Sequence, residues 1–482
     1  MELELTADAA AIAALARLKA LTICRTGRPI GRSVKIVWHD SPDRTLLAAG
    51  LTLAEQNGVR VLERLIPAAD TWLPAQPAPV VAVQDRLPVT LAPMAAFEGR
   101  QTVSIHTVGG QPVTITIAKG VLRAVAASQP AIRIRISGVA GSVREAATLI
   151  AGVGVVAVPL ATLAAEGIAL ATGQPAAPRH SGPPVLPAGP LSATAALRHS
   201  LGHLTDAMLA HAPAAIEAGG GGPEAVHQMR VAVRRARSTL TVFRTAVSPH
   251  ALDGVAQGLR DLGVRLGPVR DWDVFAGETM PIILRAMPDD VRLGRLMAAV
   301  SRRRAQCRAA LGTYLGDPTF RLLGIELAWF AAAELCRAPD DAAGKEPIPP
   351  PLTEFAAPVL RHRWKKLVEA GKRIGALDIP SLHAVRLRAK RARYAAELFL
   401  PLYPGKAPRR FIQRLSVLQQ RLGVLNDGAV AAHLLTDLGG APGRHAYAIG
   451  VVTGFLAARG MAMRPRIVSA FEKFRRLPAF WE

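Results

Sequence analysis

Two blocks of the C-terminal half recur at one fixed spacing, and this duplication constrains the fold more than any other feature of the chain. The block VHQMRVAVRRARSTLTVF, beginning at Val226, aligns with LHAVRLRAKRARYAAELF, beginning at Leu382. The block LRDLGVRLGPVRDWDV, beginning at Leu259, aligns with LSVLQQRLGVLNDGAV, beginning at Leu415, so both pairs lie 156 residues apart. A spacing shared by two separate blocks indicates a repeated structural unit. We therefore expect two bundles of about four helices each, residues 191–340 and 348–482, related by a pseudo-twofold axis.

Like charges crowd the first repeated block. Residues 226–244 contain five arginines and no acidic residue. Like charges on neighbouring helical turns repel by a few tenths of a kcal/mol per pair, so an anion from outside the chain should compensate them. The basic residues and a histidine fall at i, i+3, i+7 and i+10, which places them in one stripe on a helix. The stripe residues are His227, Arg230, Arg234 and Arg237 in the first repeat, and His383, Arg386, Lys390 and Arg393 in the second.

The two stripes predict a binding site for an extended anion. A pseudo-twofold axis would bring the stripes close together, and so many donors exceed what a single phosphate needs. Arginine suits this task, because its planar guanidinium binds phosphate oxygens through two hydrogen bonds and stays charged. Arg235 and Arg391 belong to the same repeated pattern. A merely solvated basic face is the alternative, but such a face has no reason to recur so closely.

The net charge of +23 is concentrated in the C-terminal part. Residues 1–190 carry 17 Lys and Arg against 12 Asp and Glu, whereas residues 191–482 carry 42 against 24. The natural partners of such a chain are polyanions. Aromatic residues make up only 5% of the chain, which is few for the stacking platforms of single-strand binding.

The N-terminal part has a different pattern. PVTITIAKG (112–120) and AIRIRISG (131–138) alternate with period two, as half-buried strands do. Residues 1–170 are therefore expected to form a β-rich domain, and the six prolines of residues 171–190 a linker. The uncharged run from Ala146 to Ala165 is long enough to span a bilayer, but it contains Pro159 and predicts a buried helix followed by a strand. We expect an α+β protein with no membrane segment and no signal peptide, in the cytoplasm.

The repeated blocks, together with LPLYPG after the second one, resemble the CHAD domain, the conserved histidine α-helical domain. The resemblance covers most of residues 192–482. It implies two four-helix bundles that bind inorganic polyphosphate through a basic surface, and a location on polyphosphate granules. By position it adds Arg198 and Arg361, in ALRHSLGHL and VLRHRWKKL, and the paired Arg265 and Arg421 to the expected polyphosphate contacts.

The N-terminal part resembles, in outline, a CYTH domain, the triphosphate-tunnel barrel that often precedes a CHAD domain. ELEL, with Glu2 and Glu4, resembles the start of its ExExK motif, and VWHDSPDRTLLAAGLTL (37–53) resembles a second motif. Several positions depart from the pattern: Thr6 replaces the lysine, Ala54 and Glu55 replace an arginine pair, Arg133 and Arg135 stand in the late acidic strand, and Leu163 replaces a lysine. The resemblance therefore implies a degenerate barrel without catalysis. Whether Arg133 and Arg135 point inward, or into solvent from an edge strand, is left open by the sequence.

These observations predict a non-catalytic polyphosphate-binding protein, with no catalytic residue, metal or cofactor. Two alternatives stay open. One is a tunnel-type triphosphatase that uses Mg²⁺ or Mn²⁺ and is tethered to polyphosphate, and the other is a nonspecific nucleic-acid binder. Asp271 and Asp427 are predicted to cap the helices that follow them. His199 and His203 have the i, i+4 spacing of a zinc-binding pair, but a surface pair is the simpler interpretation. The sequence does not predict the oligomeric state.

Overall fold

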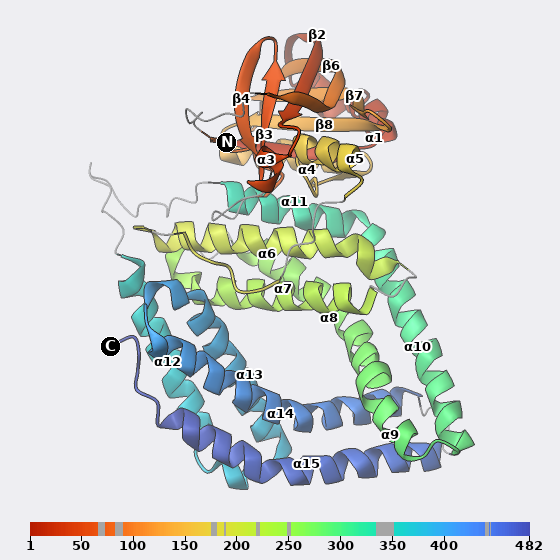
Figure 1. Ribbon diagram of the computed structural model, residues 1–482, viewed down its shortest axis with the longest axis vertical. Coiled ribbons are helices and arrows are strands. Elements are labelled where there is room, and N and C mark those ends of the chain that lie inside the picture. The colour runs from red at the N-terminus through yellow and green to blue at the C-terminus, as the bar shows by residue number, and fades with distance from the viewer. Residues whose placement is uncertain are drawn as a thin grey trace. The chain divides into compact units, whose positions relative to one another are not determined.

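A computed structural model describes the chain except for residues 66–72, 82–89, 175–180, 188, 218–221, 248–251, 334–350, 439–442 and 444. The chain divides into two compact units. The first unit comprises Met1–Ser181, Arg198–His211 and Leu315–Cys336, and the second comprises Gly182–Leu197, Ala212–Tyr314 and Arg337–Glu482. Figure 1 shows the sheet of the N-terminal part and the long helices that follow it in sequence. This confirms an α+β protein with a β-rich N-terminal region and an all-helical C-terminal region.

The first unit contains one antiparallel sheet. Its strands are β1 (Glu2–Ala7), β2 (Arg25–Asp40), β3 (Leu51–Gln56), β4 (Val59–Arg64), β5 (Val80–Val81), β6 (Ala92–Val108), β7 (Gln111–Ala124), β8 (Ser128–Gly138) and β9 (Val156–Ala157). Their order is β5-β4-β3-β2-β6-β7-β8-β1-β9. The two segments that alternate with period two form β7 and β8, as predicted. Among the described strands no backbone pairing joins β5 to β9, so the ladder is open and the closed barrel stays a prediction.

Helix α5 covers one face of the sheet. The short helices of the first unit are α1 (Ala9–Leu15), α2 (Lys19–Ile23), α3 (Thr45–Ala48), α4 (Ala140–Ala151) and α5 (Leu163–Thr172). On one face, Ala164 and Ile168 of α5 form a buried core with Trp38 and Phe97 of the sheet. Gly167 of α5 lies so close to Trp38 that an added Cβ would stand 3.1 Å from the indole ring. The α5 helix therefore fills this face tightly.

The uncharged run from Ala146 to Ala165 is not one helix. It begins in α4, whose Val143, Ala146, Ala147 and Ile150 are fully buried, and it continues through strand β9. This confirms the predicted buried helix followed by a strand. Elsewhere in the described chain, one helix, Ala446–Arg475, is long and apolar enough to cross a membrane by length and composition alone. A core helix passes the same test, so its composition settles nothing about membranes.

Long helices make up the C-terminal part. They are α6 (Ala193–Ile216), α7 (Gly222–Val242), α8 (Asp253–Val274), η3, a π-helix (Phe275–Thr279), α9 (Met280–Ala286), α10 (Val291–Gly316), α11 (Pro318–Ala332), α12 (Leu352–Ala370), α13 (Ile379–Leu398), α14 (Lys406–Leu438) and α15 (Ala446–Arg475), with single turns at η1 (Arg244–Ala246), η4 (Ile374–Ala376) and η5 (Leu400–Leu402). Both copies of the first repeated block are helical, as α7 and α13, and both copies of the second are helical, as α8 and α14. The duplication therefore predicted the helices correctly.

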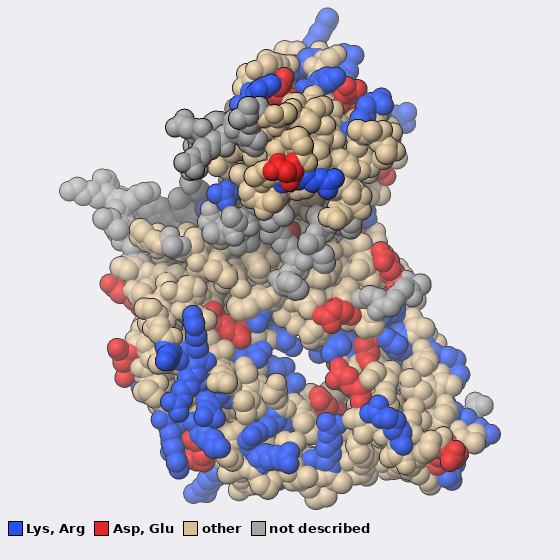
Figure 2. Space-filling view, in the orientation of Figure 1, with Lys and Arg blue, Asp and Glu red and all other residues tan. Residues whose placement is uncertain are grey.

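Two apolar contacts join the repeats within the second unit. At one end, Phe243, which follows α7, stacks on Phe355 of α12 with ring centroids 5.3 Å apart, and meets Phe399 edge to face. At the other end, Trp272 and Met280 of the first repeat share a buried core with Leu434 and Val452 of the second. Between these contacts, α7, α8, α13 and α14 surround an opening, which the space-filling view in Figure 2 also shows.

Candidate functional site

The two predicted stripes meet where α7 and α13 pack together. Arg230 and Arg234 of α7 lie close enough to Lys390 and Arg386 of α13 to perturb their protonation. The two stripes therefore lie side by side, and the pseudo-twofold axis itself stays a prediction. Figure 2 shows Lys and Arg side chains around the opening that these helices border.

The pKa of Lys390 reflects the crowding of positive charge between α7 and α13. Burial, followed by the charges of Arg234, Arg386, Arg230 and Arg393 in that order of effect, lowers the pKa of its ammonium to about 7. Burial is also the main cause that lowers the pKa of Arg234 and of Arg386. Withdrawal from water and nearby like charges both disfavour the charged form of a base.

Three of these cations have no acidic partner. Arg234, Arg386 and Lys390 form no ion pair with any described residue, although Asp427 lies near Arg386. The Nε atoms of Arg234 and Arg386 are buried and have no hydrogen-bond acceptor in the described part of the chain. A buried charge without a partner is costly, so the site is unfavourable until an anion supplies one.

Other members of the stripes are neutralised within the protein. Glu397 of α13 accepts an ion pair from Arg235 at 2.6 Å and another from Arg393 at 3.4 Å. All three side chains are largely buried. The guanidinium groups of Arg235 and Arg393 also lie over the ring of Tyr394, 4.8 and 5.5 Å from its centroid. Glu397 and Tyr394 therefore join α7 to α13, and Arg235 and Arg393 serve this contact.

The aspartates of the second repeated block have a role that the sequence did not predict. Asp271 lies inside α8 and Asp427 inside α14, so the predicted helix caps are wrong. The reason is that α8 runs without a break through η3 into α9, so no helix begins after Asp271. Its carboxylate instead pairs with Arg230 at 3.3 Å. Gly267 leaves room for this arginine, because a Cβ there would stand 3.3 Å from the Arg230 Nη1 atom.

The two histidines occupy different environments. Burial, followed by the charge of Arg270, lowers the pKa of His227. The Nδ1 atom of His383 lies 2.8 Å from the Oδ1 atom of Asn426, which can only accept, so Nδ1 donates this hydrogen bond. His383 therefore presents its Nε2 atom away from α14.

Several predicted contacts do not join the cluster between α7 and α13. Two of them lie on the helices of the stripes but face other neighbours: Arg237 is exposed beside Gly263 of α8, and Arg391 lies next to Arg363 of α12. Arg198 donates hydrogen bonds to Ala331 O and Ala332 O at the end of α11, and Arg361 pairs with Glu482 at 3.5 Å. Arg265 lies over the ring of Tyr314, and Arg421 donates a hydrogen bond to Arg466 O. Their contribution to anion binding stays a prediction.

A further buried charge cluster was missed by sequence reasoning. Asp273 is buried, and Arg304 and Arg308 of α10 both donate to it, at 2.6 and 3.2 Å. Its counterpart in the second repeat is Ala429, so the duplication gave no signal for it.

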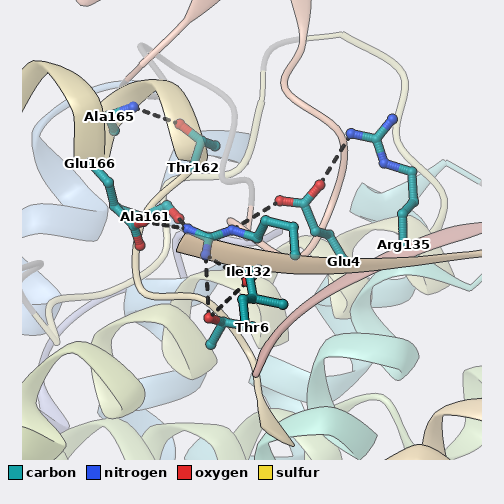
Figure 3. A network of polar contacts seen from close by, with 9 residues as sticks. Glu4, Thr6, Ile132, Arg135, Ala161, Thr162, Ala165 and Glu166 are labelled. Carbon is teal, nitrogen blue, oxygen red and sulfur yellow. Dashed lines mark hydrogen bonds and ion pairs between the residues drawn. The ribbon is translucent and has the colours of Figure 1, made fainter. Parts of the chain in front are cut away.

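In the first unit, the arginines of the late strand neutralise the remaining acidic motif (Figure 3). Arg133 is buried and lies between Glu4 at 3.4 Å and Glu166 of α5 at 2.6 Å, and Arg135 reaches Glu4 at 3.1 Å. The Nη1 atom of Arg133 also donates to the hydroxyl of Thr6. Strand β8 pairs with β7 and β1, so the edge-strand alternative is wrong.

This network removes the acidic groups that a metal would need. Both oxygens of Glu4 face guanidinium groups, and α5 packs against the same sheet face. Glu2 is exposed and accepts a hydrogen bond from Ser137. Among the described residues no group of three or more His, Cys, Asp or Glu side chains is placed to hold a metal ion.

A duplicated pair of basic helices that pack against each other defines this helical unit, and comparison with known proteins identifies its family. The sequence model of the CHAD domain matches residues 199–436. The crystal structure of the CHAD domain from the plant Ricinus communis is 30% identical, with a TM-score of 0.52, and covers 63% of this chain and 98% of that one. The chain therefore belongs to the CHAD domain family.

The chain is also similar to two curated proteins. The uncharacterized proteins MT2285 and Rv2226 of two Mycobacterium tuberculosis strains are each 30% identical over 219 residues. The match covers 44% of this chain and 40% of either relative, so the chain spans less than half of their length.

The ion pairs of Glu397 predict a large effect of its removal on stability. Glu397→Gln leaves two buried guanidinium groups without a counter-charge, which should lower the free energy of unfolding by about 3–5 kcal/mol. Urea denaturation followed by far-ultraviolet circular dichroism measures this. Glu369→Gln is the matched control, because Glu369 pairs with Lys372 on the surface, where ion pairs contribute about 0–1 kcal/mol. Equal midpoints for the two variants would show that Glu397 does not hold α7 to α13.

Proposed function

We propose that this protein binds inorganic polyphosphate, without catalysis, through the cluster formed by Arg234, Arg386 and Lys390 with Arg230. The observation that carries the proposal is that the first three are half-buried, lie close together and have no ion pair with any described residue. A polymer of phosphates would supply the missing acceptors, and arginine binds phosphate oxygens through paired hydrogen bonds. The polyphosphate ligand is what the CHAD family resemblance implies, and association with polyphosphate granules in the cytoplasm belongs to the same proposal.

The cluster suits a flexible phosphate polymer better than a nucleic acid. Successive stripe residues on α7 are three or four positions apart, so cations follow one another about every 5–6 Å. The cluster is half-buried between two helices, whereas nucleic-acid readers expose a helix or strand to a groove. Tyr394, the aromatic ring closest to the stripes, is buried beneath arginines and offers no stacking surface to a base. DNA that displaced polyphosphate at equal phosphate concentration would favour the nucleic-acid alternative.

We also propose that the N-terminal unit has lost any triphosphatase activity. A tunnel enzyme of the CYTH type needs free carboxylates for a divalent metal and free cations for the substrate. Here Glu4 is held by Arg133 and Arg135, and Arg133 is held in turn by Glu166. Each group that could act on a triphosphate is thus already paired with another.

Removing two unpaired arginines should reduce binding without reducing stability. Arg234→Gln with Arg386→Gln should weaken long-chain polyphosphate binding by at least about tenfold, because hydrogen bonds to charged groups are lost. The slope of log K against log salt should become shallower by roughly 1.5. The urea midpoint should stay equal or rise, since like-charge repulsion is relieved. Titrations at 50 and 200 mM salt measure the first two effects, and unchanged affinity would dismiss this cluster as the site.

Binding should weaken as the pH rises from 7 to 9. Lys390 has a pKa of about 7 in the free protein, and a bound polyanion raises it, so binding takes up a proton above pH 7. The affinity should fall by up to about tenfold per pH unit, the limit for one proton. Lys390→Gln should remove this dependence, and Lys390→Arg should preserve tight binding at pH 9. His227 titrates lower, because its pKa is lowered, and does not contribute in this range. A dependence that persists in Lys390→Gln would assign it to another group.

The purified protein should release no phosphate from tripolyphosphate in the presence of Mg²⁺ or Mn²⁺. A malachite green assay at pH 7 to 9 measures release, and the Glu4→Gln variant is the control. Release by the wild type that Glu4→Gln abolishes would show that the paired carboxylate is still catalytic.

A further inference from the structure

A second group of cations lies between α12 and α13, on the opposite side of α13 from the cluster described above. At 100° per residue, the mean direction of Arg388 and Arg391 lies roughly 160° around α13 from that of Arg386, Lys390 and Arg393, and the nearest pair, Lys390 and Arg391, lies about 100° apart. The two sets of cations therefore face away from each other, with the body of the helix between them.

Hydrogen bonds fix the side chains of Arg363 and Arg388 against the backbone of the facing helix, at two levels along the helix pair. The Nη1 atom of Arg363 on α12 donates to the carbonyl oxygen of Arg391 at 3.0 Å, and the Nη1 atom of Arg388 donates to the carbonyl oxygen of Lys366 at 3.2 Å. The antiparallel register of α12 and α13 thus pairs Arg363 with Arg391 and Lys366 with Arg388. Three residues separate the two levels on each helix, which is about 4.5 Å along the helix axis.

The charge of this outer groove is not neutralised by nearby acids. The two helices carry three acidic residues: Glu354 in the first turn of α12, Glu369, which pairs with Lys372, and Glu397, which pairs with Arg235 and Arg393. None of the three forms an ion pair with Arg363, Lys366, Arg388 or Arg391 among the described residues. Burial lowers the pKa of Arg363 to about 10, and the charge of Arg391 contributes. Positive charge is therefore crowded here too. Figure 2 shows many Lys and Arg side chains over the part of the helical region that contains α12 and α13.

We propose that the groove formed by Arg363, Lys366, Arg388 and Arg391 is a second polyphosphate-binding site, which lets one protein molecule hold two polyphosphate strands. The inference rests on the proposed function, because it assigns the same ligand to a different surface. Two sites on one rigid helix make the protein a cross-link between polymers, and multivalent linkage strengthens assembly without any new contact. Such a protein would gather polyphosphate into a network as well as bind it.

The test is a sandwich assay with the full-length protein. Biotinylated long-chain polyphosphate is immobilised, the protein is captured on it, and fluorescent polyphosphate is then added. The outer variant is Lys366→Gln with Arg388→Gln and Arg391→Gln, which leaves the half-buried Arg363 in place. Its control, Arg17→Gln with Lys19→Gln and Arg28→Gln, removes the same charge; Arg17, Lys19 and Arg28 are exposed and have no ion pair with any described residue. The inner variant is Arg234→Gln with Arg386→Gln.

The wild type and the charge control should retain the fluorescent polymer. The outer variant should be captured within about twofold of the wild type but lose at least about nine-tenths of the fluorescent signal. The inner variant, added at a concentration high enough for capture on the immobilised polymer, should also fail to retain the fluorescent polyphosphate. Light scattering during gel filtration should give equal masses for all variants, and a mass change limited to the outer variant would overturn the proposal by assigning the loss to subunit contacts.

The outcomes separate the two proposals. A sandwich that survives in the outer variant overturns the second site and leaves the proposed function intact. The inner variant is also tested at a protein concentration about a hundredfold above the wild-type Kd for polyphosphate. If the immobilised polymer captures none of it there, the second site is overturned, because the outer cations then do not bind polyphosphate without the inner cluster. Unchanged capture by the inner variant with loss in the outer variant overturns the proposed inner site instead.

Discussion

The repulsion between cations at the contact of α7 and α13 is the constraint on which the helical unit depends. Two helices that each carry a basic stripe do not pack together unless something offsets their charge. Glu397 does so from within, by pairing with Arg235 and Arg393, and the ring of Tyr394 lies beneath both guanidinium groups. The apolar contacts at Phe243 and around Trp272 fix the ends of the repeats. Together they keep Arg234, Arg386 and Lys390 close to one another.

Arg133 in the sheet and the cluster arginines between α7 and α13 differ in how their charge is balanced. Arg133 lies between Glu4 and Glu166, and both carboxylates pair with it. Arg234 and Arg386 form no ion pair with a described residue, although Asp427 lies near Arg386. Similar residue types thus form a network of paired charges in one place and a cluster of cations without ion pairs in the other. What differs is the supply of acidic groups within reach, and residue counts alone do not reveal it.

Much of the fold followed from two kinds of periodicity. The 156-residue repeat located α7, α8, α13 and α14, and period-two alternation located β7 and β8. The alternation can be read within one segment, and the repeat requires only the comparison of two segments. The prediction that the two stripes lie close together is confirmed by the contact between α7 and α13.

The failures share a physical cause, which is that partners come from other elements. Asp271 looked like a helix cap because a helix-like segment follows it, but η3 continues the helix and the carboxylate pairs with Arg230. Arg235 and Arg391 are equivalent by sequence, yet the first reaches Glu397 and the second lies against α12. Their surroundings differ because α12 contacts only one of the two repeated helices so closely. Symmetry in sequence does not guarantee symmetry in contacts.

Glu397 shows how far the two halves have diverged since they were copies. The position equivalent to Glu397 in the first repeat is Thr241, which cannot neutralise a guanidinium group. One carboxylate therefore serves arginines of both halves. Without the second repeat, Arg235 would lose its counter-ion. Without the first repeat, Glu397 would keep only Arg393 as a partner. At this contact the charge balance of each half therefore depends on the other half.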